Sequence, residues 1–377
     1  MKVILLSRFD PFGSVYGGEV NTHNLAASLA QRGNEVWVVH GGQSDGFRRA
    51  ESGVIDVPVR ALSIPIVGGV QANMTAATRL ERLTSEHEID ILDMRGAGLA
   101  LAASRASTRV RARVFHAVDS VRDEFLALSL GRRLRYVPVY LGLVWTEGMA
   151  IRDTDGVITD TKPVCESLRQ HYPNSRSLWD VIPPGVPNRW VESVTGECDP
   201  TQFLYIGAGP RRDLQLFADA LALAAKRGVR LRGVVLREDA SKVRQISRKS
   251  GAVLTYLPPM SDSDLHALFG SSCAFVLPSL REAFCTPILE AATHGTPSVV
   301  SDLSTVKEFV QNGHSGYVVA DRRADSWADA LIKMSTDPAL RSYLGRNAKD
   351  LSRKFTMDQI AKRTEDFYHR VLGRSYS

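Results

Sequence analysis

Two carboxylates, Glu282 and Glu290, lie eight positions apart in the second half of the chain. The apolar run at residues 274–277 before them predicts a buried strand, and Pro287 between them suits the first turn of a helix. The order strand, loop, helix places Glu282 on the loop at the carboxyl end of the strand and Glu290 one turn into the helix. Carboxylates in these places can accept hydrogen bonds from the hydroxyl groups of one ligand.

The first turn of that helix carries backbone N–H groups that have no partner inside the helix, and such groups hold anions. They belong to Phe284, Cys285 and Thr286. A helix start that can bind an anion, with a carboxylate on each side, predicts a site for a sugar nucleotide. The helix start would bind the diphosphate, and the carboxylates would accept hydrogen bonds from the hydroxyl groups.

This arrangement resembles the Glu-x7-Glu motif of retaining glycosyltransferases of the GT-B fold, most closely that of glycosyltransferase family 4 (glycosyl transferases group 1). Further positions typical of the family follow at Gly295-Thr296-Pro297, Ser301, Glu308, Gly313 and Gly316. The resemblance covers nearly the whole chain. It has one departure inside the motif, Cys285, where the family usually has glycine.

The resemblance implies a role for each part of the motif. It assigns Glu290 to the ribose hydroxyls of the donor and Glu282 to the donor sugar. It assigns the donor diphosphate to the backbone N–H groups of Phe284, Cys285 and Thr286, together with Arg211 or Arg212. Retention in this family is generally attributed to attack on the face from which the phosphate departs, so no covalent nucleophile is expected.

One loop departs from the family pattern. In the segment from Gly207 to Asp213, Gly207 fits, whereas Ala208 takes the place of the usual arginine and Arg212-Asp213 that of lysine-glycine. A departing nucleoside diphosphate needs fixed cations or N–H donors. Arg211 and Arg212 either supply these charges, since arginine binds phosphate through two N–H groups, or are solvated surface charges.

The N-terminal half supplies further candidates. Gly17-Gly18 precede a helix expected from Asn21 to Arg32, and glycine lets the backbone approach a ligand closely. His116 ends the strand expected at 113–116. By resemblance, Gly17 and Gly18 shape the donor cleft, and His116 contacts the donor sugar near the transferred carbon.

Short apolar strands alternate with amphipathic helices, a pattern typical of doubly wound α/β domains. Three prolines and a glycine in Val181–Pro187 predict a stiff connector. With the GT-B fold that the resemblance implies, we expect two Rossmann-like domains facing a central cleft. They are an acceptor-side domain at 1–183, a nucleotide-sugar-binding domain at 184–355 and, at 356–377, a helix that crosses back to the first domain.

The composition suits an ordinary globular protein of two domains, with 377 residues of which 44% are apolar and 23% charged. The net charge of +6 is mild, and aromatic residues do not interleave with a basic run, so no nucleic-acid partner is expected. The four cysteines show no metal spacing. No segment reaches the ~18 apolar residues of a membrane span, and the apolar start is too short for a signal peptide, so we expect a cytoplasmic protein.

Two rival enzyme classes have weaker support. Gly207-x-Gly209 follows a strand, but Arg212 stands where the nicotinamide-binding Gly-x-Gly-x-x-Gly has its third glycine. Asp153-x-Asp155 and Asp262-x-Asp264 have the spacing of metal-binding carboxylates. However, the first pair precedes a strand, and capping of a helix start explains Asp262. We expect no essential metal and no cofactor besides the nucleotide sugar as co-substrate.

Residues 125–144 mix leucine, valine and tyrosine with Arg132, Arg133 and Arg135, and Pro138 interrupts the run. The mixture fits either a membrane-surface helix or an ordinary helix packed on the first domain. The first interpretation gives peripheral membrane contact at the inner face of the membrane and a lipid-linked acceptor.

The sequence thus predicts a retaining, metal-independent glycosyltransferase of the hexosyltransferase type. It would move a sugar from a nucleoside diphosphate sugar to a hydroxyl of a glycan, a lipid-linked acceptor or a small molecule. The alternative is a non-catalytic member of the fold that binds a nucleotide sugar or a partner protein. No motif determines the base (UDP, GDP or ADP), the sugar, the acceptor or the oligomeric state.

Overall fold

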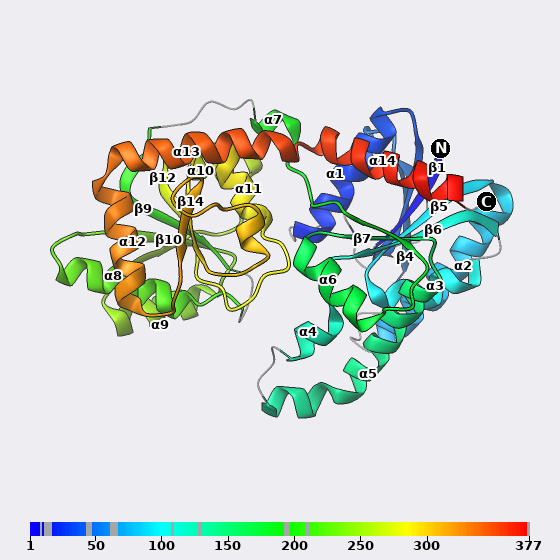
Figure 1. Ribbon diagram of the computed structural model, residues 1–377, viewed down its shortest axis with the longest axis horizontal. Coiled ribbons are helices and arrows are strands. Elements are labelled where there is room, and N and C mark those ends of the chain that lie inside the picture. The colour runs from blue at the N-terminus through cyan, green and yellow to red at the C-terminus, as the bar shows by residue number, and fades with distance from the viewer. Residues whose placement is uncertain are drawn as a thin grey trace. The chain divides into compact units, whose positions relative to one another are not determined.

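The chain forms two compact α/β units (Figure 1). The computed structural model describes residues 1–7, 10, 17–42, 47–60, 67–106, 109–126, 130–191, 197–207 and 211–374. Unit 1 comprises Met1–Gly185 and Met357–Ser377, and unit 2 comprises Val186–Thr356. The boundary at Gly185 lies within the proline-rich connector predicted at Val181–Pro187.

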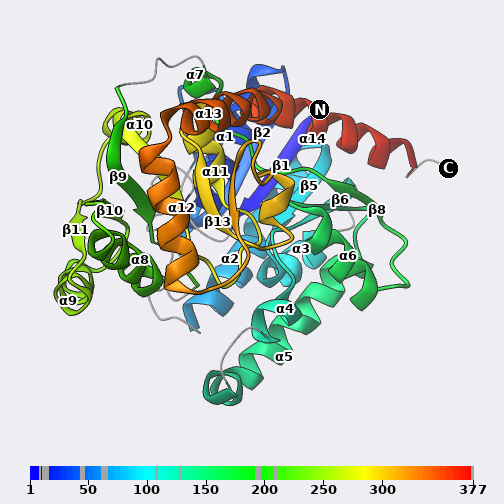
Figure 2. The same cartoon turned by 60° about the vertical axis from the view of Figure 1, so that its left-hand side comes forward.

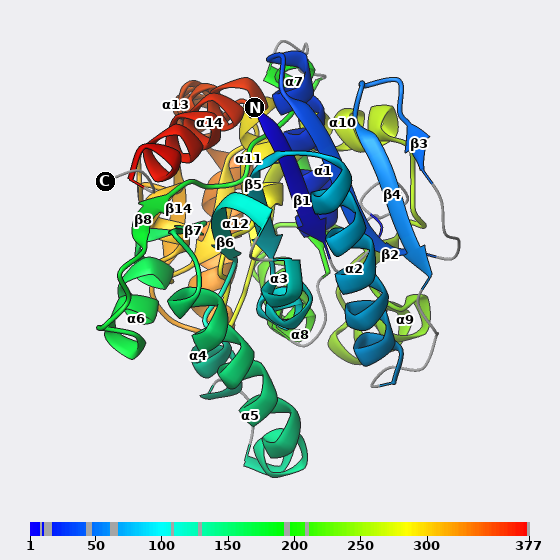
Figure 3. The same ribbon diagram turned by 90° about the vertical axis from the view of Figure 1, so that its right-hand side faces the viewer.

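Unit 1 is built on a sheet in the order β3-β4-β2-β1-β5-β6-β7-β8 (Figure 3), in which β3 pairs antiparallel and the other described strands pair parallel. Its strands are β1 Lys2–Ser7, β2 Glu35–Gly42, β3 Arg48–Arg49, β4 Ile55–Arg60, β5 Ile89–Arg95, β6 Val110–Ala117, β7 Gly156–Thr159 and β8 Leu178–Val181. Its α-helices are α1 Gly17–Gln31, α2 Val67–Glu86, α3 Ala100–Ala106, α4 Val121–Leu126, α5 Leu130–Arg152, α6 Lys162–His171 and α14 Met357–Arg374.

Unit 2 is built on a parallel sheet in the order β11-β10-β9-β12-β13-β14. Figure 2 labels β9, β10, β11 and β13 of this sheet. Its strands are β9 Asp199–Ile206, β10 Arg232–Leu236, β11 Val253–Tyr256, β12 Ser272–Leu277, β13 Ser298–Ser301 and β14 Gly316–Val319. Its α-helices are α7 Asn188–Val191, α8 Leu214–Lys226, α9 Ala240–Ser250, α10 Asp262–Ser271, α11 Thr286–Thr293, α12 Ala324–Thr336 and α13 Pro338–Ser352.

Both sheets are covered by helices on both faces, because successive side chains of a strand point to opposite sides. In β9, Phe203 and Tyr205 pack with α8 and α12, whereas Leu204 and Ile206 pack with α10 and α11. The near-continuous apolar strands of the sequence are therefore buried on both faces.

The C-terminal helix α14 packs on the sheet of unit 1, although it follows unit 2 in the sequence. Gly156 at the start of β7 makes this packing possible, since a Cβ there would lie 2.8 Å from Val371 Cγ2 and 2.9 Å from the Phe367 ring. The buried Tyr368 hydroxyl of α14 donates to Asp93 Oδ2 of β5 at 2.7 Å. Return of the last helix to the first unit is thus fixed by close packing.

Two expectations about single elements were wrong, and one strand was not predicted. Helix α1 begins at Gly17 and not at Asn21, so the glycine pair forms its first turn. Strand β4 was not expected; its Pro58, which lacks an N–H, is tolerated because β3 pairs only with residues 55 and 56. Pro138 does not end its helix, since α5 continues through it to Arg152. In the described ranges, no helix is both long and apolar enough to cross a membrane.

Candidate functional site

In each unit the order of strands reverses beside the first strand, and ligands of doubly wound sheets bind at that point, outside the carboxyl ends of the strands. The reversal lies between β1 and β5 in unit 1 and between β9 and β12 in unit 2. The predicted residues of unit 2 follow β9 and β12. Those of unit 1 follow β1 or, for His116, lie at the carboxyl end of β6.

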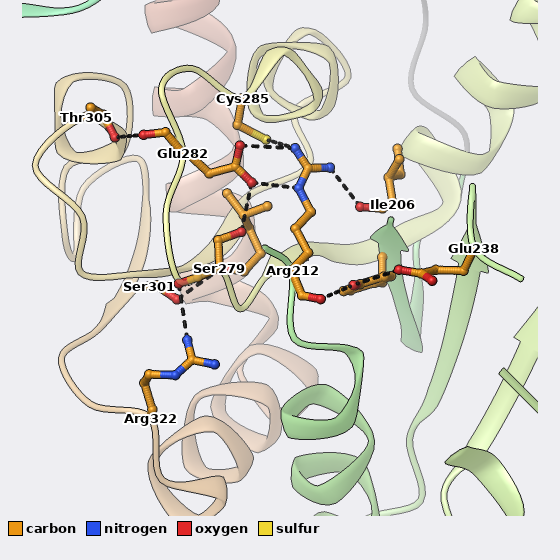
Figure 4. A network of polar contacts seen from close by, with 11 residues as sticks. Ile206, Arg212, Glu238, Ser279, Glu282, Cys285, Ser301, Thr305 and Arg322 are labelled. Carbon is orange, nitrogen blue, oxygen red and sulfur yellow. Dashed lines mark hydrogen bonds and ion pairs between the residues drawn. The ribbon is translucent and has the colours of Figure 1, made fainter. Parts of the chain in front are cut away.

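In unit 2, Glu282 and Arg212 form a buried ion pair at the reversal point (Figure 4). Arg212 Nε donates to Glu282 Oε1 at 2.7 Å, and Arg212 Nη2 lies 3.4 Å from Oε2. Ser279 Oγ also donates to Oε1, at 2.8 Å. Arg212 is only 7% exposed and Glu282 only 4%, so the ion pair lies inside the protein.

This pair joins the loops that follow β9 and β12. Arg212 Nη1 donates to the carbonyl of Ile206 at 2.8 Å, at the end of β9. The N–H of Leu280 donates to the carbonyl of Arg211 at 2.8 Å, and the Thr305 hydroxyl donates to the carbonyl of Glu282 at 2.6 Å. Backbone and side-chain bonds thus hold the loop before α11 from both sides.

The contacts separate the two arginines that were predicted for the diphosphate. Arg211 is exposed, and its side chain has no ion pair or hydrogen bond with any described residue. Arg212 instead directs its donors to Glu282, Ile206 and Cys285 inside the protein. Of the two, Arg211 is therefore the cation that remains available to a ligand, and Arg212 holds Glu282 in place. Ala208, the other departure in this loop, lies outside the described residues.

Glu290 differs from Glu282 in having no partner for its carboxylate within the described ranges. The residue is partly exposed on α11, but the surrounding protein desolvates the carboxyl and raises its pKa to about 7, against the opposing positive charge of Arg237. A carboxylate held near its titration point without a protein partner is typical of a ligand-binding group.

The N-terminus of α11 supplies N–H groups beside these carboxylates. Cys285 is the N-cap residue, and no side chain caps the helix. The N–H groups of Phe284, Cys285 and Thr286 donate to no acceptor that the structure describes, and Pro287 has no N–H. Three neighbouring donors at the positive end of a helix dipole can bind a phosphate oxygen.

The cysteine that departs from the motif has a structural role. Cys285 is 3% exposed, and its Sγ lies 3.4 Å from Arg212 Nη2. Burial raises the pKa of its thiol to about 12, so at neutral pH it is a thiol and no nucleophile. The side chain points into the protein while the backbone N–H remains available, so the departure is compatible with the predicted role of this N–H.

Gly207 and Arg237 belong to the same edge of the sheet. A Cβ on Gly207 would lie 2.6 Å from the carbonyl oxygen of Arg237 and 2.5 Å from Glu238 Cγ, so only glycine fits. Arg237 has a φ of 54°, which among the described residues is the single positive φ outside glycine. Such a conformation costs about 1 kcal/mol or more, and strained residues cluster at functional sites. Sequence reasoning missed Arg237, because its conformation leaves no trace in the sequence.

In unit 1, His116 lies at the carboxyl end of β6 between two charged side chains. Arg95 Nη2 lies 3.0 Å from His116 Nδ1, and His116 Nε2 lies 2.8 Å from Asp160 Oδ1. Arg95 also donates from Nη1 to Thr22 Oγ1 on α1, at 3.3 Å. The four residues connect the ends of β5, β6 and β7 with the first helix.

These contacts determine the tautomer of His116. An arginine can only donate, so Nδ1 of His116 accepts the hydrogen bond from Arg95. Nε2 then carries the ring proton and donates a hydrogen bond to Asp160 Oδ1. Both ring nitrogens are then occupied by the protein. A direct hydrogen bond from the ring to the donor sugar, as the resemblance implies for His116, would require one of these bonds to break.

Arg95 and Asp160 were absent from the sequence-based site, although a signal was present. Each ends or directly follows a buried strand, which is the signal that had identified His116.

One explanation from the sequence was wrong in detail. Asp262 begins α10, but the cap is Ser261, whose Oγ accepts from the N–H of Asp264 at 3.2 Å.

The first turn of α1 lies at the reversal point of unit 1. A Cβ on Gly18 would meet no atom of the described residues within 4 Å outside its own helix, so their packing does not explain the glycine. The carbonyl of Gly18 accepts from Thr22 Oγ1 at 3.0 Å, and Thr22 in turn contacts Arg95. The space that the described residues leave at Gly18 is compatible with the close approach of a ligand to the backbone.

The tautomer of His116 is directly testable. In the full chain labelled with 15N, we expect the imidazole signals of His116 to show a protonated Nε2 and an unprotonated Nδ1. Arg95→Met removes the donor to Nδ1 and should shift the Nδ1 resonance, whereas Arg111→Met, which removes a surface ion pair with Asp90, should leave it unchanged. A proton on Nδ1 in the unsubstituted protein would contradict the assignment.

Comparison with known proteins gives the same picture for both halves of the chain. Residues 199–351 match the family model of glycosyl transferases group 1, and residues 15–189 match that of glycosyltransferase family 4.

Among relatives, a D-inositol 3-phosphate glycosyltransferase of Pseudarthrobacter chlorophenolicus is 29% identical over 236 residues, which are 58% of this chain and 56% of that protein. Another of this name from an Arthrobacter species is 32% identical over 122 residues, which are 32% of this chain and 29% of that protein. In the longer of these matches, the chain spans about half the length of the relative.

Two solved structures resemble the chain over nearly its full length. Sucrose-phosphate synthase of Thermosynechococcus elongatus has a TM-score of 0.80 at 16% identity and covers 99% of this chain and 100% of its own. HepE of Anabaena, crystallised with UDP and glucose, has a TM-score of 0.74 at 17% identity. The match covers 98% of this chain and 100% of the HepE chain. At these identities the likeness shows the fold.

Proposed function

Because the chain belongs to glycosyltransferase family 4 and has the GT-B fold, we propose that it moves a sugar from a nucleoside diphosphate sugar to a hydroxyl acceptor. The strongest support comes from the arrangement of groups at the carboxyl ends of the strands of unit 2. There, the N–H groups of residues 284–286 at the start of α11 lie between Glu282, which is buried and paired with Arg212, and Glu290. Among the described residues, neither these N–H groups nor the Glu290 carboxylate has a hydrogen-bond partner.

In this proposal Glu290 accepts hydrogen bonds from the ribose hydroxyls, and the N–H groups of 284–286 hold the diphosphate. Arg211 and Arg237, both exposed at this edge, supply the positive charge that the departing diphosphate requires. Arg212 is a positioning residue: it orients the Glu282 carboxylate, which contacts the donor sugar.

We propose that transfer retains the configuration of the sugar. The bond between the anomeric carbon and the phosphate oxygen breaks, and the acceptor oxygen forms its bond on the same face. The acceptor proton passes to the departing phosphate. Cations and N–H groups of the protein stabilise the charge that develops, so no metal is required.

The first test is calorimetric binding of UDP, GDP and ADP to the full chain, with magnesium and with EDTA, and with NAD as control. We expect one diphosphate to bind in the micromolar range equally well in EDTA, and NAD not to bind. Binding that requires magnesium would contradict the metal-independent mechanism, and binding of no diphosphate would overturn the donor site.

A second candidate function is a non-catalytic protein that binds a nucleotide sugar. Ala208 favours it, because the family usually has an arginine there. Release of nucleoside diphosphate from the donor sugar separates the two functions, since a binding protein leaves the donor intact. D-inositol 3-phosphate is the first acceptor to add, because the names of the relatives contain it.

A further inference from the structure

Helix α5 projects from unit 1 in all three views, with α4 beside it (Figures 1–3). Its C-terminal part is anchored: Glu147 is buried, and its carboxylate accepts from the N–H of Val121 and from the Tyr172 hydroxyl, each at 2.9 Å. Ala150 and Ile151 are buried as well. The base of the helix is thus fixed in the fold, and the part before it extends away from the sheet.

The projecting part carries no charge over residues 136–145, whose sequence is Tyr-Val-Pro-Val-Tyr-Leu-Gly-Leu-Val-Trp. Large apolar side chains there are well exposed, with Leu141 at 60%, Trp145 at 54%, Val139 at 48%, Tyr136 at 46% and Val137 at 36%. At 100° per residue these positions are distributed around the whole helix. Tyr140 is less exposed, and its ring stacks on that of Phe125 on α4.

A helix that is apolar on all sides is ordinarily buried, in a protein core or in lipid. The fold of unit 1 does not bury this one. Its contiguous exposed apolar surface is therefore of the kind that marks an interaction site.

The charges next to this surface indicate what covers it. The segment from 125 to 146 contains Arg132, Arg133 and Arg135 and no acidic residue. Positive charge beside an apolar, aromatic-rich stretch complements an anionic lipid surface. A second copy of the chain would bring like charges together, which disfavours self-association.

We propose that residues 130–145 of α5 dock the protein on an anionic lipid bilayer. Ten uncharged residues extend only about 15 Å along a helix, half the thickness of the hydrocarbon core, so the helix lies in the interface and does not span. Trp145 and the tyrosines suit the headgroup level, and the positive charge of the arginines attracts lipid phosphates. The proposal is independent of the transferase activity.

The test is cosedimentation of the full chain with vesicles of phosphatidylcholine, with and without phosphatidylglycerol, in the absence of nucleotide sugar. We expect binding to the anionic vesicles, weakened by salt, with a blue shift of tryptophan fluorescence. Leu141→Glu should reduce binding at least tenfold, because it puts a charge into the apolar contact. Arg133→Gln should reduce it about fivefold, as expected for one arginine near an anionic surface.

Val253→Glu is the matched control, because Val253 in unit 2 is 61% exposed, compared with 60% for Leu141. It should bind vesicles like the unsubstituted protein, and unchanged thermal unfolding should show that all variants are folded. Equal binding of Leu141→Glu and Val253→Glu would overturn the proposal. An absence of vesicle binding by the unsubstituted protein would overturn it as well. If sedimentation equilibrium then showed self-association that Leu141→Glu abolishes, the surface would be an interface between copies of the chain.

Discussion

Replacing Arg212 by methionine should lower the free energy of unfolding by about 3–5 kcal/mol, because the buried Glu282 carboxylate then loses its cation. Only the Ser279 hydroxyl would remain as a donor to this carboxylate within the described residues. The measurement is urea unfolding of the full chain, followed by circular dichroism. Arg227→Met is the matched control: Arg227 pairs at the surface with Asp325 and Asp329, so its loss should cost about 1 kcal/mol or less.

A double-mutant cycle separates the pair from its surroundings. Glu282→Gln should also destabilise, since it leaves a buried guanidinium without its carboxylate. The double variant Arg212→Met with Glu282→Gln should lose clearly less stability than the two single losses added. Additive losses, or a cost no larger than that of Arg227→Met, would show that the pair does not hold the loop.

The same variants test the division of roles between the arginines. Arg211→Met removes an exposed cation, so it should leave stability unchanged and weaken binding of the nucleoside diphosphate about tenfold. If Arg212 instead contacted the phosphate directly, a folded Arg212→Lys variant would lose as much affinity as Arg211→Met.

Glu290→Gln should stabilise the chain above pH 7 while it weakens donor binding. Desolvation raises the pKa of Glu290 to about 7 from an ordinary 4.5, so the folded protein retains a proton that the unfolded chain releases. As pH rises from 4.5 to 7, the stability that this proton provides is lost. Above pH 7 the folded state holds a desolvated carboxylate, at a cost of up to roughly 3 kcal/mol.

Unfolding of the full chain between pH 5 and pH 8 measures this cost. The advantage of Glu290→Gln should be about 1–3 kcal/mol at pH 8 and should shrink as the pH falls toward 4.5. Glu166→Gln, on the exposed face of α6, is the control for the loss of one negative charge. An advantage that does not depend on pH would contradict desolvation of the Glu290 carboxylate as its cause.

Donor binding should change in the opposite direction. A hydroxyl bonded to a carboxylate contributes about 1.5–3 kcal/mol, so Glu290→Ala should weaken nucleoside diphosphate binding about tenfold to a hundredfold. Glu290→Gln keeps one acceptor oxygen and should lose less. Unchanged affinity in Glu290→Ala would contradict the assignment of the ribose hydroxyls to Glu290.

Local patterns in the sequence were sufficient for the fold and for the motif of unit 2. Apolar strands buried on both faces and amphipathic helices predicted two doubly wound α/β units, and the family comparisons confirm that class. Glu282, Glu290 and the helix that starts at Thr286 follow from residues close together in the chain, because a strand, a turn and the first turn of a helix are local structures.

Contacts between distant segments were decided only by the tertiary structure. Arg212 and Glu282 are seventy positions apart, and Arg95 and Asp160 approach His116 from neighbouring strands. The sequence shows that these residues are charged, but not that they pair. The pairing depends on the strand order, which brings the ends of β9 and β12, and of β5, β6 and β7, to one edge.

Burial was likewise beyond the sequence, because one residue pattern is compatible with several environments. Residues 125–144 fitted both a packed helix and a surface helix, and among the described side chains of α5 the structure buries only ones from Thr146 onward. Desolvation of Glu290 and the strained backbone of Arg237 arise from neighbours in space. The sequence by itself thus determined the elements and the chemistry available at their ends. The tertiary structure decided which of those groups are paired and which remain available to a ligand, because pairing depends on distances that local sequence does not encode.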